Sequence, residues 1–293
     1  MTEKEFQLKK AREYEQEGKT LHAIQLYTRL LASPDDKRIS SIRLASLYET
    51  IDRKDAAINI LRNFLSDNTE DDEVRKFLCN FLIRNSYFHE ALEELSNLST
   101  KEHPEVNFLA GIINYNIHEF EIARINFDDF VHKNRHSDLL PDAFLYLARI
   151  YLQLKNHDKA LESVKKSEKL FSQNHELYLL YAMIHYEKGM YFHANDYIQK
   201  AIKFNSKDIQ LHEWAGRILL KTGDFEKAET HFKKVIKQNT SDPEIYTLLA
   251  SVYLSAKKLK EAENYFNKAL KINPSYQAAL DGKQKCNYAE SER

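Results

Sequence analysis

The chain has 293 residues, with 43 basic and 44 acidic side chains, and its formal net charge of -1 gives no overall electrostatic reason to bind nucleic acid or an anionic membrane. Only six glycines and five prolines occur, and so few helix breakers favour an all-α fold. The N-terminal segment is charged, and no apolar run approaches the roughly 20 residues that span a bilayer, so we expect neither a secretory signal nor membrane insertion. The two cysteines, Cys79 and Cys286, suit a reducing compartment, and we expect a cytoplasmic protein.

In chain order, the predicted elements are pairs of short helices that recur from one end to the other. Apolar residues return at three- and four-residue intervals within each helix. An alanine marks the second helix of each pair, at intervals of 34, 34, 32, 37, 34, 34 and 34 residues: Ala23, Ala57, Ala91, Ala123, Ala160, Ala194, Ala228 and Ala262. We therefore expect one solenoid over residues 1–293, with repeats at approximately 4–37, 38–71, 72–103, 104–140, 141–174, 175–208, 209–242 and 243–274 and a capping helix over 275–290.

Three further positions repeat in register with these alanines. Twelve residues before each alanine stands a small residue that lets the two helix axes of a pair approach closely: Ala11, Ala45, Cys79, Gly111, Ala148, Ala182, Gly216 and Ala250. Four residues after it stands a large apolar residue that fills the adjoining space: Tyr27, Leu61, Leu95, Phe127, Val164, Ile198, Phe232 and Phe266. Five residues before it the chain turns, at Gly18, Asp52, Ser86, His118, Lys155, Gly189, Gly223 and Lys257. A left-handed backbone there suits glycine best.

The prolines and the C-terminal segment indicate where repeats begin and end. Three prolines open repeats and two close them: Pro104, Pro141 and Pro243 at the openings, and Pro34 and Pro274 at the ends. In the last, solitary helix we expect Tyr276, Ala279 and Leu280 to cover the final repeat while charged residues face water.

A helix pair of about 34 residues with these positions resembles the tetratricopeptide repeat, whose pattern is W-x2-L-G-x2-Y, then A-x3-F, then P. The last repeat matches this motif through Tyr246, Leu249, Ala250, Tyr253, Ala262, Phe266, Ala269 and Pro274. The resemblance covers roughly residues 4–274, with departures at Lys10, Asn107 and Asn114. It implies a right-handed superhelix in which the first helices line the concave surface and the second helices lie outside.

The sequence contains no motif for catalysis or for a cofactor. Phosphate-binding glycine loops, G-x-S-x-G and paired cysteine motifs are all absent. The closest approach to a metal site is His132, His136 and Asp138, which lack the glutamate of known zinc motifs. The acidic segment 67–73 does not have the residue spacing of an EF-hand. Its negative charges instead stabilise the N-terminus of the helix that follows. We expect no enzyme activity, no metal and no cofactor.

The resemblance implies that a ligand peptide lies along the first helices. Relative to the marker alanines, the contact positions of the family fall on the following residues of the middle repeats: Phe108, Ile112 and Tyr115, then Leu145, Arg149 and Leu152, then Leu179, Met183 and Tyr186. Polar residues occupy these positions in flanking repeats, among them Lys76, Asn80 and Arg217. An apolar, aromatic strip of this kind often marks a binding groove. The alternative is that these side chains pack against neighbouring helices of a tightly wound solenoid.

One activity of the family can be tested directly on the sequence. Lys76 and Asn80 match the first residues with which co-chaperones grip the C-terminal carboxylate of a heat-shock protein. The next repeats place Leu109 and Asp142 where an asparagine and a basic residue are required. Because the aspartate would repel a carboxylate, we expect no such clamp.

Two functions remain, and both rely on recognition. The first is a non-enzymatic scaffold or adaptor that binds a protein partner, as a peptide or a helix, on its concave surface. The second is a regulatory or sensor protein in which a bound ligand or peptide changes the pitch of the superhelix and so controls a target. Neither function involves nucleic acid or membrane insertion, and self-association is possible but not indicated.

Overall fold

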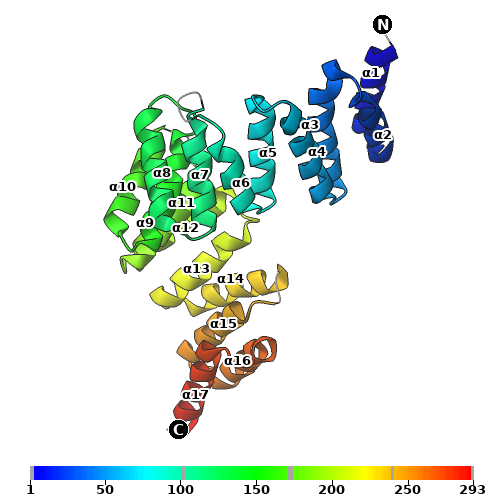
Figure 1. The fold of residues 1–293 in the computed structure, drawn as a ribbon. Helices are drawn as coiled ribbons and strands as arrows, with labels where there is room; N and C mark the ends of the chain where they lie inside the picture. Colours follow the sequence, from blue (N-terminus) through cyan, green and yellow to red (C-terminus); the bar gives the residue numbers. More distant parts are fainter. Residues whose placement is uncertain (1–2, 100–102, 171–173, 239–240, 292–293) are drawn as a thin grey trace. The chain divides into compact units, whose positions relative to one another are not determined.

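A computed structural model of the chain describes residues 3–99, 103–170, 174–238 and 241–291 (Figure 1). All regular secondary structure in these residues is helical, in 17 helices. Sixteen of them form eight consecutive pairs and the last stands alone, which confirms the predicted all-α solenoid of helix pairs with a C-terminal helix. Within the described ranges, no helix has both the length and the apolar character needed to cross a membrane.

The helices fall into two compact units, residues 1–134 and residues 135–293. The N-terminal unit contains α1 (Glu3–Gln16), α2 (Thr20–Leu30), α3 (Pro34–Thr50), α4 (Lys54–Asp67), α5 (Asp72–Arg84), α6 (Phe88–Ser96), α7 (Glu105–Asn116) and α8 (Phe120–Lys133). The C-terminal unit contains α9 (Leu140–Gln153), α10 (His157–Leu170), α11 (His175–Glu187), α12 (Tyr191–Phe204), α13 (Ile209–Thr222), α14 (Phe225–Gln238), α15 (Pro243–Ser255), α16 (Leu259–Ile272) and α17 (Gln277–Ser291). Within each unit every helix packs against the next one, so each core is a series of interfaces.

The repeated small and large residues form the contact between the two helices of a pair. All eight marker alanines are 0% exposed. A β-carbon added to Gly111 would lie 2.8 Å from the ring of Phe127, and one added to Gly216 would lie 2.7 Å from the ring of Phe232. The large residue of the second helix therefore seats directly on the backbone of the first, which is why this position is small.

The turn between the two helices of each pair has the same backbone conformation in all eight repeats. The residue five before each marker alanine has φ between 56° and 85°: Gly18, Asp52, Ser86, His118, Lys155, Gly189, Gly223 and Lys257. Five of these residues carry a β-carbon in the left-handed region, where L-residues are strained. The geometry of the pair imposes this conformation on whichever residue stands there.

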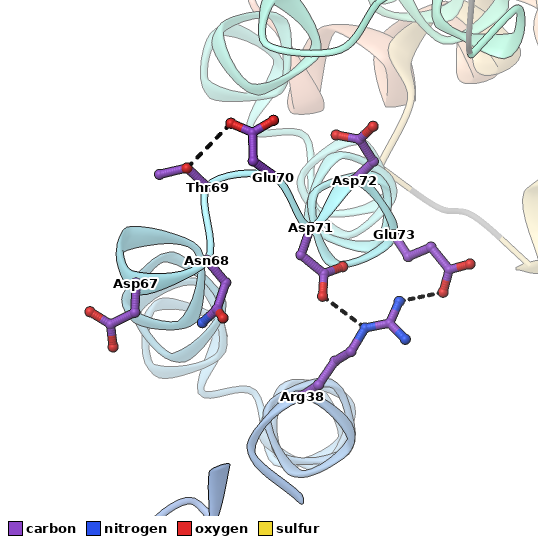
Figure 2. Close-up of a pocket in the computed structure, with 8 residues that line it drawn as sticks. All are labelled: Arg38, Asp67, Asn68, Thr69, Glu70, Asp71, Asp72 and Glu73. Carbon is purple, nitrogen blue, oxygen red and sulfur yellow. Dashed lines mark hydrogen bonds and ion pairs between the residues drawn. The ribbon is translucent and has the colours of Figure 1, made fainter. Parts of the chain in front are cut away.

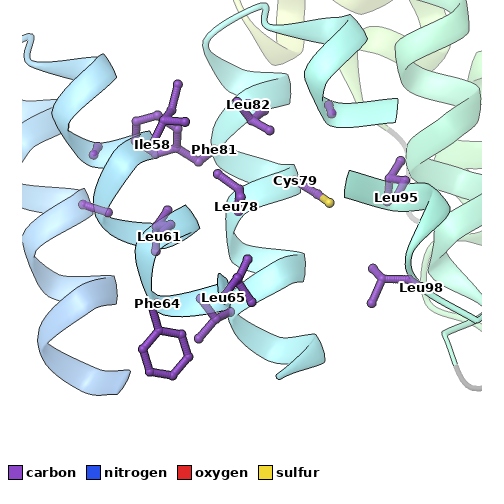
Figure 3. Close-up of a cluster of buried hydrophobic side chains, with 14 of the residues drawn as sticks. Ile58, Leu61, Phe64, Leu65, Leu78, Cys79, Phe81, Leu82, Leu95 and Leu98 are labelled. Carbon is purple, nitrogen blue, oxygen red and sulfur yellow. The ribbon is translucent and has the colours of Figure 1, made fainter. Parts of the chain in front are cut away.

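Figure 3 shows part of the core of the N-terminal unit, with side chains from α4, α5 and α6. Leu61 and Phe64 of α4 and Leu78 of α5 are each at most 5% exposed. Cys79 is a free thiol in the same cluster, and burial raises the pKa of this thiol to about 12. Cys79 therefore serves as a small packing residue, as the sequence predicts.

The position of Pro34 differs from the prediction. It is the first residue of α3 and follows Ser33, whose backbone is extended, so Pro34 opens a helix pair and does not close one. Proline fits here because the first amide of a helix has no intrahelical partner. Pro141 and Pro243 lie in the first turns of α9 and α15 as predicted, and Pro274 follows the end of α16.

The last helix, α17, covers the final pair, although one of its predicted contacts is wrong. Ala279 is fully buried and Tyr276 packs on the core of the C-terminal unit, but Leu280 is 40% exposed. Cys286 occupies the buried face instead, at 2% exposure. Since Ala279 and Cys286 are seven residues apart, they share one helical face, and Leu280 lies off it.

Candidate partner-binding surface

In the N-terminal unit, α7 carries three of the predicted contact residues, and one of them belongs to the core. Phe108 is 7% exposed, and its ring packs on those of Phe127 and Phe130 of α8, with centroids 5.6 Å and 5.3 Å apart. Ile112 and Tyr115, on the same helix, are partly exposed. The accessible part of this surface is therefore narrower than the sequence predicts.

Helix α5 carries the two predicted polar contacts of the N-terminal unit. Lys76 Nζ lies 3.5 Å from a carboxylate oxygen of Glu105 at the start of α7. Asn80 is exposed, and its side-chain amide donates to the carbonyl of Lys76, 3.0 Å away. The charge of Lys76 thus joins two neighbouring repeats, while Asn80 remains open to solvent.

In the C-terminal unit, three leucines predicted to contact a partner are buried. Leu145 and Leu152 of α9 are 3% and 8% exposed, and Leu179 of α11 is 5% exposed. The first helices α9, α11 and α13 each contact the next one, and each also packs against the second helix of its own pair. These three leucines therefore fit the alternative in which the side chains pack against neighbouring helices.

The arginines of this face occupy equivalent places two repeats apart. Arg149 of α9 lies over the ring of Tyr146, 5.4 Å from its centroid, and pairs with Glu176 of α11. Arg217 of α13 lies over the ring of Trp214, 5.8 Å from its centroid, and pairs with Glu244 of α15 at 2.8 Å. In both places a stacked arginine links one first helix to the next.

The charge of Arg217 is fixed by its partners. Burial alone would lower the pKa of its guanidinium, but hydrogen bonds to Glu244 and Glu213 raise that pKa above its ordinary value. Both carboxylates lie 2.8 Å from the same nitrogen. The guanidinium is therefore a positioned cation beside the indole of Trp214.

A cluster of partly exposed aromatic residues lies where α11 approaches α13. Tyr186 of α11 contacts Trp214 of α13 edge to face, with ring centroids 5.6 Å apart, and it contacts Tyr191 at 5.4 Å. Met183, one turn before Tyr186, is partly exposed, as are Tyr186 and Trp214. We call Met183, Tyr186, Trp214 and Arg217 the first-helix face.

Sequence reasoning did not find Trp214, the single tryptophan of the chain. It stands fourteen residues before its marker alanine, outside the positions at which the family contacts ligands. The signal that could have found it is the aromatic residue Tyr146 at the same position two repeats earlier, with an arginine three residues further on in both cases.

A cavity of about 580 Å³ lies in the N-terminal unit, at the acidic segment before α5 (Figure 2). Arg38 of α3 reaches into this segment, and its guanidinium lies 2.8 Å from Asp71 and 2.5 Å from Glu73. Asp71 also accepts a hydrogen bond from the amide of Val74 at 3.0 Å, which is the helix N-terminal role expected for this segment. Its carboxylates are thus engaged by the protein itself.

The histidines considered as metal ligands do not share a helix. His132 lies in the last turn of α8, which ends at Lys133, and His136 lies beyond that end. Within the part of the chain that the structure describes, no group of three or more histidine, cysteine, aspartate or glutamate side chains is arranged to hold a metal ion.

Comparison with solved structures identifies the same fold in several proteins. A chain of the APC/C hetero-tetramer Cut9-Hcn1 superposes with a TM-score of 0.70 and 17% identity over 91% of this chain, which spans about half (52%) of that chain. A tetratricopeptide repeat protein from Parabacteroides merdae gives a TM-score of 0.54 and 15% identity, with 97% of this chain and 98% of that chain covered. YrrB gives 0.51 and 19%, with 67% and 97% covered.

Sequence comparison leads to a family. No curated protein matches the chain. The sequence model described as the tetratricopeptide repeat protein 21 C-terminal ARM domain matches residues 89–281, which is more than half of the chain. With helix pairs throughout the described residues and this match, the chain belongs to the family of tetratricopeptide repeat protein 21 C-terminal ARM domains.

Proposed function

We propose that this protein is a non-enzymatic scaffold or adaptor that binds a peptide or helix of a protein partner on the first-helix face of its C-terminal unit. The observation that carries the proposal is the accessible contact between Tyr186 and Trp214 beside Met183. Partly exposed aromatic rings in a packed, preformed arrangement are the usual anchors of protein interfaces.

The chemistry of this face suits a peptide that carries an apolar anchor. Methionine adapts its shape to a partner side chain, and tyrosine and tryptophan offer large rings with little rotational freedom to lose. Arg217 lies at the edge of the face, where its fixed charge orients the partner. Its guanidinium is already paired with two carboxylates, so we assign it to orientation and not to the main binding energy.

The family and the fold are consistent with this role. Repeat proteins of this kind present extended concave surfaces that bind partners. YrrB, which shares the fold, is described as having an unusual peptide-binding site, and Cut9-Hcn1 is an assembly of several chains. For this chain we propose protein partners because its first-helix face carries partly exposed aromatic side chains. The exposed Asn80 and the partly exposed Ile112 and Tyr115 offer a second, smaller surface in the N-terminal unit.

We also propose that the protein acts in the cytoplasm. Both of its cysteines, Cys79 and Cys286, are free and buried. A protein that keeps unpaired thiols as packing residues suits a reducing compartment. Fractionation of native cells, with detection of the protein in the soluble cytoplasmic fraction, tests this location.

The binding proposal is tested with partly exposed residues, since Leu145 and Leu179 are buried and charging them would unfold the chain. Met183→Glu is expected to remove the partners that co-purify with the protein from its native cells, because it places a charge among the apolar side chains of the face. The matched control is Phe192→Glu on α12, where the side chain is 75% exposed.

Helical circular dichroism should be the same for both variants and the wild type. Emission of Trp214 gives a second readout, because a partner seated beside the only indole of the chain excludes water from it. Identical partners for Met183→Glu and wild type, at equal helicity, would rule out the first-helix face.

A further inference from the structure

A groove of about 510 Å³ lies among α10, α11 and α12, away from the first-helix face. Its lining contains none of the residues that the family resemblance implies as ligand contacts, and it comes mostly from one helix: Leu161, Lys165, Glu168 and Lys169 of α10, Tyr181 and His185 of α11, and Tyr197 of α12. All of these residues belong to the C-terminal unit. The groove is therefore a separate feature that the proposed function does not use.

Stacked rings make one wall of the groove. The ring of Tyr197 stacks on that of Tyr181, with centroids 4.7 Å apart and planes 15° apart, and on that of His185, with values of 5.2 Å and 8°. The hydroxyl of Tyr181 donates to Glu168 at 2.6 Å, which ties α11 to α10. The wall is consequently formed before any ligand arrives, and a ligand need not order it.

The other wall is cationic. Lys165 and Lys169 are one turn apart on α10. Outside the lining, the ammonium of Lys200 on α12 lies over the Tyr197 ring, 5.0 Å from its centroid. The carboxylate in the lining, that of Glu168, is engaged by the Tyr181 hydroxyl. Like charges one helical turn apart repel each other. An anion in the groove would relieve this repulsion.

His185 contributes a neutral polar group to the wall of stacked rings. Burial, and then the nearby charges of His193, Lys188 and Lys165, lower the pKa of this imidazole. Its Nδ1 is buried and has no hydrogen-bond partner among the described residues. The groove thus combines apolar rings with an excess of lysine ammonium groups over carboxylates.

We propose that this groove binds an acidic segment of a partner protein, which seats one apolar side chain against Leu161 and Tyr197 while its carboxylates meet Lys165 and Lys169. Charge complementarity selects the occupant, since the lining carries two lysines and one carboxylate, that of Glu168, and an acidic segment would balance the remaining positive charge. The apolar contacts and the short length of the cationic wall fit a peptide better than a nucleic acid, whose binding needs a longer basic track.

The test uses a dye-labelled peptide, Asp-Glu-Phe-Asp-Glu, and its basic counterpart, Lys-Arg-Phe-Lys-Arg, in fluorescence anisotropy titrations of the full chain. The acidic peptide should bind at least about tenfold more tightly than the basic one. Lys165→Glu with Lys169→Glu should weaken acidic-peptide binding by about tenfold or more. The control, Lys260→Glu with Lys271→Glu on α16, changes the net charge equally at exposed positions and should leave the affinity unchanged.

Three results would overturn the proposal. Equal weakening by both double variants would mean attraction by net charge alone. Equal affinity for a peptide with alanine in place of phenylalanine would mean that no apolar side chain is seated. Displacement of the acidic peptide by a single-stranded oligonucleotide at lower concentration would assign the groove to nucleic acid. Met183→Glu should leave all of these titrations unchanged, so the two surfaces are tested independently.

Discussion

At the scale of single residues, the contact between a small and a large side chain sets how closely the helices of a pair approach. In two pairs the small residue has become glycine, at Gly111 and Gly216, and a phenylalanine ring lies directly on it. The pair of α9 and α10 uses Ala148 and Val164 at the same positions. In the pairs with Gly111 and Gly216, the missing methyl group therefore makes room for the ring.

Gly216→Ala is expected to lower the free energy of unfolding. The added methyl would overlap the Phe232 ring, and such overpacking costs about 1–3 kcal/mol, offset by about 1 kcal/mol of better helix propensity. Adding Phe232→Val reproduces the alanine and valine of the α9 and α10 pair. Urea unfolding of both single variants and the double variant should show a favourable coupling of about 1 kcal/mol or more, and simple additivity would contradict the compensation.

A histidine pair makes the stability of the C-terminal unit depend on pH. His231 of α14 and His212 of α13 face each other with their Nδ1 atoms 2.9 Å apart, and Lys234 contacts His212 from the same side as the Ser206 carbonyl. Burial, and then the neighbouring His212 and Lys234, lower the pKa of His231 from 6.5 to about 4. The folded chain therefore holds His231 neutral where the unfolded chain protonates it.

Between pH 6.5 and about 4, the folded state binds fewer protons than the unfolded state. The free energy of unfolding should therefore be complete above pH 6.5 and fall as the pH decreases through this window, by at most about 3 kcal/mol from His231. Urea unfolding at pH 7 and at pH 4.5 measures this decrease in the free energy of unfolding. Carboxylates titrate in the same range, so the difference between wild type and His231→Phe is the relevant quantity, and a difference that is independent of pH would contradict the prediction.

At the scale of elements, the turn inside each helix pair has one backbone conformation whatever its sequence. Lys155 adopts φ 59° between α9 and α10, where glycine stands in three other repeats. Lys155→Gly is expected to raise the free energy of unfolding by about 1 kcal/mol, because it removes the strain of a β-carbon in the left-handed region. Lys155→Ala retains the β-carbon and should give no such gain. Equal stability of the two variants in urea unfolding would show that the turn is unstrained.

The sequence predicts the helix pairs and their turns because these depend on contacts within one repeat. The spacing from Ala228 to Gly216, Gly223 and Phe232 is set by helix geometry alone, and the structure reproduces it. The exposure of Leu179 depends instead on how all the helices around α11 pack against it, which the apolar pattern of one helix does not show. Trp214 was missed for the same reason, because its place in the proposed surface comes from its contact with Tyr186 of the preceding repeat.

Near the ends of elements, a single residue decides between core and solvent. Ala279 of α17 is buried and the neighbouring Leu280 is 40% exposed, because the helix turns about 100° per residue and a shift of one position moves a side chain off the buried face. The pattern of apolar residues therefore predicts where the terminal helix lies in the sequence, but not which of its faces is buried.

At the scale of the whole molecule, the chain separates into two compact units at residues 134 and 135. The interval between marker alanines is longest there, at 37 residues between Ala123 and Ala160. Because stability in repeat proteins comes from contacts between neighbouring helices, each unit should contain most of the contacts that it needs.

A fragment of residues 135–293 is therefore expected to fold alone, with cooperative thermal unfolding monitored by circular dichroism. The matched control is a fragment that begins at His157 and so lacks α9. It would expose the buried Ala160 and Val164 of α10 and should lose stability or aggregate. Equal stability of the two fragments would mean that the helix pair is not the unit of folding.

Each unit contains one buried thiol whose reaction with a reagent reports the opening of that unit. Cys79 lies in the core of the N-terminal unit and Cys286 lies on the buried face of the terminal helix of the other, and burial raises the pKa of both. An alkylating reagent can reach either sulfur only during a transient opening, so the rate of modification counts those openings one unit at a time. Fraying of the last helix and opening of the first core can then be timed separately in the unaltered protein.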